Sequence, residues 1–185
     1  MLRLLQVPDA SLIYHICDLF TVSHRHCEEY HTAVEIWTTE TLPVYKECLG
    51  DHPWTASILQ HIAFAFMALA RENPTDYAAQ AEMYTKEALY LRGRLLGVHQ
   101  DTARSHIHLS LVYIMQEKLD LALVELEKAL EIQEDVVGVQ QDTIDTLNMM
   151  SDVLRRLGRE QEAASMTERA KYYRRELDRP SEMQT

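Results

Sequence analysis

The sequence repeats one short pattern three times, as Gly50-Asp51-His52-Pro53-Trp54-Thr55, Gly97-Val98-His99-Gln100-Asp101-Thr102 and Gly138-Val139-Gln140-Gln141-Asp142-Thr143. Each copy begins with glycine and has threonine five residues later, and successive copies begin 47 and then 41 residues apart. The longer interval contains the loop-like stretch around Pro74. Because the spacing changes only where a turn can lengthen, the pattern indicates an internal structural repeat.

Two further patterns recur after each threonine. A small residue is followed three positions later by a bulky one, and then two alanines stand seven positions apart. Steps of three, four and seven put side chains on one face of a helix, and paired alanines leave a flat stripe where a second helix can approach closely. The small residues are Ala63, Ser110 and Ser151, the bulky ones Phe66, Tyr113 and Leu154, and the alanine pairs Ala81/Ala88, Ala122/Ala129 and Ala163/Ala170.

The repeating unit is therefore predicted to be a pair of antiparallel helices. Glycine ends each second helix in a left-handed conformation, and Asp101 or Thr102, and likewise Asp142 or Thr143, is expected to cap the next helix. The low content of glycine and proline, five residues of each, argues against a sandwich or barrel. We predict an all-α chain with helices at 9–22, 25–48, 53–70, 75–95, 100–115, 119–136, 141–157 and 160–178.

The expected organisation is one N-terminal unit, three repeats and a short tail. Residues 1–49 form a degenerate or capping hairpin, or a repeat cut short, whose second helix should kink or break at Pro43. The repeats cover 50–96, 97–137 and 138–178, and a frayed tail covers 179–185. One pair cannot bury its apolar stripe alone, so stacked pairs share a continuous core.

Charge and cysteine content limit the classes of partner. The net charge of −11 argues against nucleic-acid binding, because most of the surface would repel phosphate, and we expect neither a nucleic-acid nor a membrane partner. The acidic surface either favours basic partners or serves solubility. The chain has an odd number of cysteines, Cys17, Cys27 and Cys48, and no CxxC motif. This favours reduced thiols and a cytoplasmic location.

These residues resemble the tetratricopeptide repeat (TPR). The usual period is about 34 residues, whereas the longer period here and the turns Leu49-Gly50-Asp51-His52 and Leu96-Gly97-Val98-His99 are similar to the long repeats of kinesin light chains and nephrocystin-like proteins. The blocks also look like repeat arrays of some large invertebrate nucleotide-binding receptors. The resemblance covers about 34–178 and departs from the pattern at Gln140 and at Ala170-Lys171. It implies a right-handed superhelical solenoid.

The resemblance also implies a function: a non-catalytic module that binds a peptide or partner segment in its concave groove, as part of a larger scaffold or receptor-like protein. The groove is lined in that family by the first helix of each pair, and an Asn at the place of Asn148 tends to contact the peptide backbone in kinesin light chains. Ile107 departs from that amide pattern. The groove residues carried over are Ser57, Gln60, Phe64 and Met67, then Arg104, Ile107, Leu111 and Ile114, then Asp145, Asn148, Asp152 and Arg155.

The second repeat places three apolar residues on a nominally open face, and two interpretations stay open. Ile107, Leu111 and Ile114 are either covered by the second-helix layer or the N-terminal hairpin, or they form an apolar floor that takes a partner's side chains. The second hypothesis for the whole chain is a structural spacer or self-association domain without a peptide ligand, which includes weak homo-oligomers.

Other chemistry finds little support. The segment His24-Arg25-His26-Cys27-Glu28-Glu29-Tyr30-His31 holds zinc ligand types, but a polar helix turn explains it more simply. His106 is expected to be a hydrogen-bonded core histidine, and His52 and His99 to serve the turn or cap. Of Tyr172 and Tyr173, one should pack inward. No phosphate loop, Gly-x-Ser-x-Gly or His-Glu-x-x-His motif is present, so we expect no enzyme, no metal and no cofactor.

Overall fold

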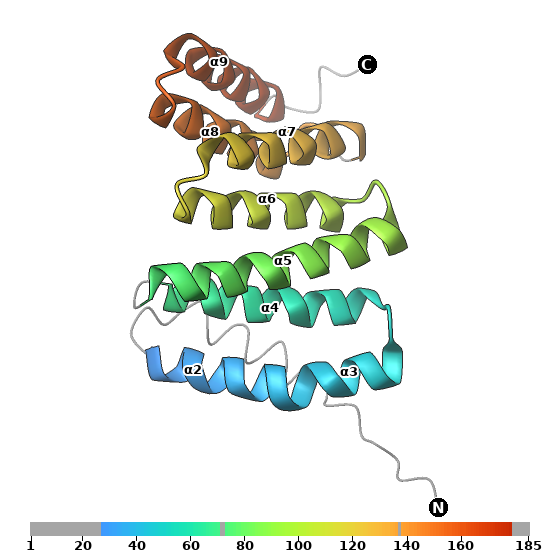
Figure 1. The fold of residues 1–185 in the computed structure, drawn as a ribbon. Helices are drawn as coiled ribbons and strands as arrows, with labels where there is room; N and C mark the ends of the chain where they lie inside the picture. Colours follow the sequence, from blue (N-terminus) through green and yellow to red (C-terminus); the bar gives the residue numbers. More distant parts are fainter. Residues whose placement is uncertain (1–26, 71–72, 137, 179–185) are drawn as a thin grey trace, which may run out of the picture.

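A computed structural model describes residues 27–70, 73–136 and 138–178, and in these segments every regular element is a helix (Figure 1). From residue 53 onward, each predicted helix boundary agrees with the structure to within one residue. The predicted helix at 9–22 lies outside the described residues. The elements are α2 (Cys27–Ile36), η1 (Trp37–Thr41), α3 (Leu42–Leu49), α4 (Pro53–Leu69), α5 (Pro74–Leu96), α6 (Gln100–Met115), α7 (Leu119–Val136), α8 (Gln141–Arg156) and α9 (Glu160–Leu177).

The expected disturbance at Pro43 takes the form of one wide helical turn. Element η1 is a π-helical turn in which the Leu42 amide donates to the carbonyl of Trp37, five residues back. Proline has no N–H for the usual bond to the fourth preceding carbonyl, and Pro43 stands in the first turn of α3. The chain therefore stays helical through Pro43 from α2 to α3.

The repeated glycine and threonine act together at two of the three turns. Gly50, Gly97 and Gly138 have φ values of 59°, 61° and 73°, a region that a Cβ disfavours. The hydroxyl of Thr55 donates to the carbonyl of Gly50 at 2.9 Å, and Thr143 makes the same bond to Gly138 at 2.9 Å. The five-residue spacing between glycine and threonine therefore reflects a side-chain hydrogen bond across the turn.

The helix caps differ from the expectation. His52 caps α4 and His99 caps α6, because each imidazole Nδ1 accepts the backbone N–H two residues later, at 3.2 and 3.1 Å. Gln140 caps α8 in a capping box with Thr143. The predicted aspartate and threonine caps were wrong, whereas the predicted cap role of the two histidines is confirmed.

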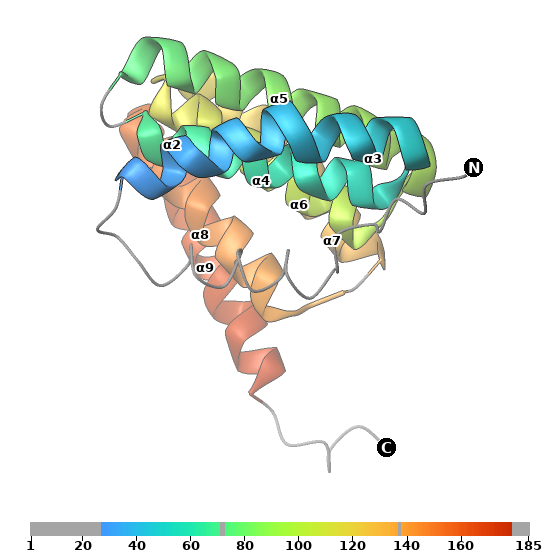
Figure 2. The same cartoon turned by 90° about the horizontal axis from the view of Figure 1, so that it is seen from below.

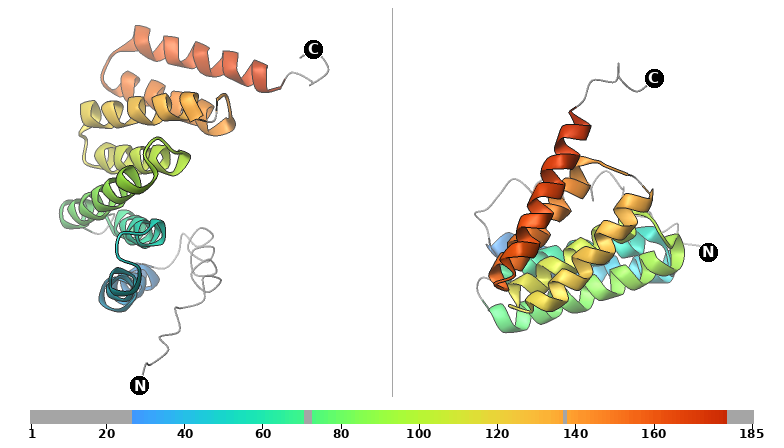
Figure 3. Two further views of the ribbon diagram at one scale, coloured as in Figure 1. Left: turned by 90° about the vertical axis from the view of Figure 1, so that its right-hand side faces the viewer. Right: turned by 90° about the horizontal axis from the view of Figure 1, so that it is seen from above.

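The helices stack as consecutive antiparallel pairs: α4 with α5, α6 with α7, and α8 with α9, and each second helix also contacts the following first helix (Figures 1 and 3). The predicted small residues are buried at these contacts, since Ala63 and Ser110 are fully covered. All six alanines of the three pairs are buried as well. The directions of the helices rotate along the stack, so that α9 crosses α4 and α5 at a steep angle (Figures 2 and 3).

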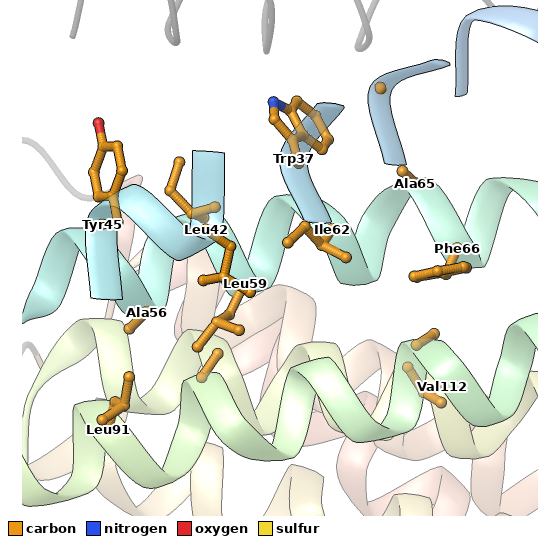
Figure 4. Close-up of a cluster of buried hydrophobic side chains, with 14 residues drawn as sticks. Trp37, Leu42, Tyr45, Ala56, Leu59, Ile62, Ala65, Phe66, Leu91 and Val112 are labelled. Atoms are coloured by element: carbon orange, nitrogen blue, oxygen red, sulfur yellow. The ribbon is translucent and has the colours of Figure 1, made fainter. Parts of the chain in front are cut away.

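The core of the described residues consists of three buried clusters, each of which joins side chains from neighbouring helices. Its N-terminal cluster joins Trp37 and Tyr45 to Leu59 and Ile62 of α4, to Leu91 of α5 and onward to α6 (Figure 4). A second cluster joins α7, α8 and α9 through side chains such as Leu126 and Leu147. Each fully buried Leu or Ile contributes roughly 1.5–3 kcal/mol, so neighbouring pairs depend on one another for stability.

Candidate functional site

The first helices of the three pairs, α4, α6 and α8, lie side by side, and we call the face that they share the first-helix surface. The rings of Phe64 on α4 and His108 on α6 meet edge to face with centroids 4.5 Å apart. Arg104 on α6 approaches Asp142 on α8 at 3.8 Å. All twelve residues predicted for the groove lie on these three helices.

On α4 the predicted residues differ in exposure. The Phe64 side chain is 38% exposed, and Ser57 and Met67 are half-buried. Gln60, which was expected to point outward, is only 3% exposed. In the described part of the chain neither its amide nitrogen nor its amide oxygen has a hydrogen-bond partner. This residue departs from the expectation and holds unused hydrogen-bonding capacity.

On α6 the three apolar positions are intermediate between the two interpretations. Ile107, Leu111 and Ile114 are all half-buried, and Ile114 also packs against the buried cluster between α6 and α7 and against the cluster of α7, α8 and α9. Arg104 is exposed and forms an ion pair with Asp101 at 3.2 Å. The helix therefore offers a partly accessible apolar strip beside a charged end.

On α8 all four predicted residues are exposed. Arg155 donates to Asp152 at 2.9 Å and to the hydroxyl of Thr167 at 3.1 Å, which fixes its guanidinium against α9. Asn148 lines a pocket of about 350 Å³ together with Thr167, Lys171 and Arg174. The amide that the resemblance singled out thus lies in a concavity with a cationic rim.

Sequence reasoning missed Arg92, which comes from the second helix α5. Its Nη1 donates to the Ser105 hydroxyl at 2.6 Å and its Nη2 to the Ser57 hydroxyl at 3.5 Å, so it bridges α4 and α6. Burial lowers the pKa of Arg92, and the charge of Arg104 lowers it further, against the opposing effect of Asp101. Arg92 stands four residues after the second alanine of its pair, a register position that the sequence could have flagged.

Two histidines lie near this guanidinium. Burial, together with the charges of Arg92 and Arg104 and the nearby His61, lowers the pKa of His108 to about 4. Burial and Arg92 also lower the pKa of His61. Both imidazoles are therefore neutral at pH 7, and in the described residues Nδ1 of His108 has no hydrogen-bond partner.

The prediction for His106 is confirmed. Its Nδ1 lies 2.6 Å from a carboxylate oxygen of Glu125 on α7, and Lys128 donates to the other oxygen at 2.7 Å. Burial alone would raise the pKa of the Glu125 carboxyl, but the hydrogen bonds from His106 and Lys128 outweigh it and hold that pKa below its usual range. This ion cluster ties α6 to α7.

The remaining sequence candidates are structural or not described. Tyr173 is half-buried and donates to Glu134 at 2.8 Å, whereas Tyr172 is exposed, as expected for an inward and an outward aromatic. His24 and His26 of the metal-like segment lie outside the described residues, as do the side chains of Cys27 and Glu28. Among the side chains that the structure describes, no group of three or more His, Cys, Asp or Glu could hold a metal ion. In the same segments no helix has both the length and the apolar character needed to cross a bilayer.

No protein-family model matches the sequence, and no curated protein matches it. Solved structures do match. BtubC (BKLC) from P. vanneervenii is 24% identical with a TM-score of 0.72, and the match covers 84% of this chain and 61% of that one. A putative kinesin light chain of Podospora anserina with nearly identical TPR-like repeats is 17% identical with a TM-score of 0.67, covering 82% of this chain and 70% of that one. A point variant of that protein gives a TM-score of 0.68.

The predicted resemblance is confirmed at the level of the fold: the chain has the fold of the TPR-like repeats of kinesin-light-chain proteins. Repeat folds of this kind are generally protein-interaction modules and typically non-catalytic. The chain spans 61% of the length of BtubC.

Proposed function

We propose that this chain binds a peptide or an extended partner segment along the first-helix surface. The observation that carries the proposal is the row of accessible polar side chains on α8, Asp145, Asn148, Asp152 and Arg155, which continues the half-buried apolar strip of α6. An apolar strip beside ordered polar groups is the usual composition of a peptide-binding face.

The chemistry of the surface suits an extended chain. The Asn148 side chain can both donate and accept, which matches the alternating N–H and C=O groups of a peptide backbone. Arg155 is held by Asp152 and Thr167, so less side-chain freedom is lost when a partner contacts it. The half-buried Ile107 and Leu111 would take apolar side chains of the partner.

A double variant tests the proposal. Asn148→Ala with Arg155→Glu should weaken capture of partners identified by pulldown with the full chain and mass spectrometry, and calorimetry on each identified partner should show at least a tenfold loss of affinity. Both residues are exposed, so the circular dichroism spectrum should not change. The control is Gln80→Ala with Arg94→Glu, which makes the same chemical changes at exposed positions of α5. Equal affinity of the two double variants would contradict the proposed surface.

A structural role as a spacer or self-association domain is the second candidate. Large apolar side chains are exposed on the second helices, namely Met83 and Tyr90 on α5 and Leu121 and Val124 on α7. Such groups favour association between copies. Light scattering at several concentrations separates the two candidates: a firm dimer whose first-helix surface is occluded supports assembly, and a monomer with an accessible surface supports peptide binding.

A further inference from the structure

Arg92 is a partly buried cation whose contacts lack a carboxylate. Its guanidinium donates to the hydroxyls of Ser57 and Ser105, and no ion pair links it to a carboxylate of the described residues. Removing a cation from water costs several kcal/mol unless an anion compensates for it. In a chain with 29 aspartates and glutamates and a net charge of −11, the absence of a carboxylate in direct contact is unexpected, since the nearby Asp101 acts on Arg92 without an ion pair.

The hydrogen-bonding capacity around Arg92 is also unfilled. A guanidinium has five N–H donors, and two of them are engaged here. The hydroxyls cannot serve as further donors, because Ser57 donates to the carbonyl of Pro53 at 3.1 Å and Ser105 donates to the carbonyl of Asp101 at 3.2 Å. Arg92 therefore retains three donors for a ligand.

The two helices that Arg92 bridges, α4 and α6, each carry another polar side chain without a partner among the described residues. Gln60 lies one helical turn after Ser57 on α4, is 97% covered, and has both amide atoms unpaired among the described residues. His108 lies one turn after Arg104 on α6, and its unpartnered Nδ1 belongs to a ring held edge to face on Phe64. Buried polar groups without partners are rare in folded proteins and often mark a place that a ligand completes.

We propose that Arg92, Gln60 and His108 form a binding site for one oxyanion, a carboxylate or a phosphate group, carried by a side chain of the bound partner. The guanidinium fork matches two oxygens of such a group. The Gln60 amide and the Nδ1–H tautomer of His108 each donate one hydrogen bond, and the exposed Arg104 adds positive charge beside the site. The choice of a partner side chain as the source rests on the proposed function, whereas the anion chemistry does not.

The same register positions show that this site belongs to one junction only. The residue four positions after the second alanine is Arg92 on α5, Gln133 on α7 and Arg174 on α9. Gln133 is buried and neutral, so the junction of α6, α7 and α8 lacks the cation. Arg174 lies in the open pocket beside Asn148. Among the junctions that the structure describes, the α4–α5–α6 junction is the one that places a partly buried guanidinium between two first helices.

The test is a titration of the full chain with inorganic phosphate and with acetate, at ionic strength held constant with chloride, observed by NMR. The Arg92 Nε–Hε resonance and the His108 ring should shift and saturate with one or both anions. Bound anion should also raise the pKa of His108 from about 4. Arg92→Gln should weaken binding at least tenfold, because it removes a charge-assisted contact. The matched control Arg94→Gln, on the exposed side of α5, should leave binding unchanged.

A second variant keeps the test decisive if Arg92→Gln unfolds the chain. Gln60→Leu with His108→Phe fills the site with apolar groups and should also weaken binding at least tenfold. Absence of saturable shifts in the wild type, or equal binding by this variant, would overturn the site. If phosphate binds more tightly than acetate, the source is a phosphorylated side chain, and the reverse order identifies an aspartate, a glutamate or a chain terminus. Since these probes need no partner, failure of the peptide proposal would appear separately, in the calorimetry described above.

Discussion

The threonine that follows each glycine should have opposite effects on stability in different repeats. In two copies its hydroxyl bridges the turn: Thr55 donates to Gly50 and Thr143 to Gly138, each at 2.9 Å. In the middle copy the hydroxyl of Thr102 is buried and has no hydrogen-bond partner in the described residues. Replacement by valine keeps the shape and the β-branch of threonine, so only the hydroxyl is tested.

The expected magnitudes follow from these contacts. Thr143→Val removes one hydrogen bond and leaves the Gly138 carbonyl without that donor, which costs about 1–2 kcal/mol of the free energy of unfolding. Thr55→Val should cost a similar amount. Thr102→Val removes an unpaired buried hydroxyl and should raise the free energy of unfolding by about 1 kcal/mol. The variants at 102 and 143 should therefore differ by about 2–3 kcal/mol.

Urea denaturation followed by circular dichroism at 222 nm measures this difference. The slopes of the unfolding curves should match between variants, so that a shift in midpoint reports stability alone. Destabilisation by Thr102→Val equal to that by Thr143→Val would show that the hydroxyl bond is not what the repeated threonine contributes.

Three further substitutions test the turn, the ion cluster and the alanine stripe. Gly97→Ala should lower the free energy of unfolding by about 1–2 kcal/mol, because φ at this position is +61°, which strains an alanine even though the added Cβ meets no atom within 4 Å. Thermal unfolding measures this loss, and an unchanged midpoint would contradict the backbone strain. His106→Leu should cost about 1–3 kcal/mol at pH 7 by removing a partner of buried Glu125. Because the pKa of the Glu125 carboxyl is lowered in the fold, its ionised form stabilises the fold above pH 4.5, and this stabilisation is lost as the pH falls below that value. Denaturation at pH 7 and pH 3 should therefore show a smaller stability difference between wild type and variant in acid, and a constant difference would refute the pairing. Ala129→Met should cost about 1–3 kcal/mol by overpacking a fully covered helix contact, and a urea midpoint equal to wild type would refute close approach there.

The repeat and its helices could be predicted from the sequence because each repeated residue has one local role. Gly97 needs positive φ, Ala88 needs a close helix contact, and both requirements leave a mark at fixed spacing. The caps could be predicted only in part. The recurrence of His52 and His99 at the turn predicted a turn or cap role, whereas the common preference for aspartate and threonine caps was misleading, because Thr143 instead donates across the turn.

The candidate site was only partly accessible to sequence reasoning. A helical spacing rule places Asn148 and Gln60 at equivalent positions of α8 and α4, yet the first is exposed and the second is buried. The difference arises from the neighbouring elements, which spacing within one helix does not describe. Arg92 was missed because the rule assigned the binding face to the first helices, whereas a long side chain on a second helix reaches between two of them.

Because the Arg92 side chain extends from a second helix to a position between two first helices, residues of the second helices can set the chemistry of the first-helix surface. One residue per repeat, four positions after the second alanine, decides whether a junction holds a cation, as at Arg92, or a neutral amide, as at Gln133. Substitutions at this position, in evolution or in the laboratory, would change the binding chemistry of one junction at a time and leave the buried contacts between the helices unchanged.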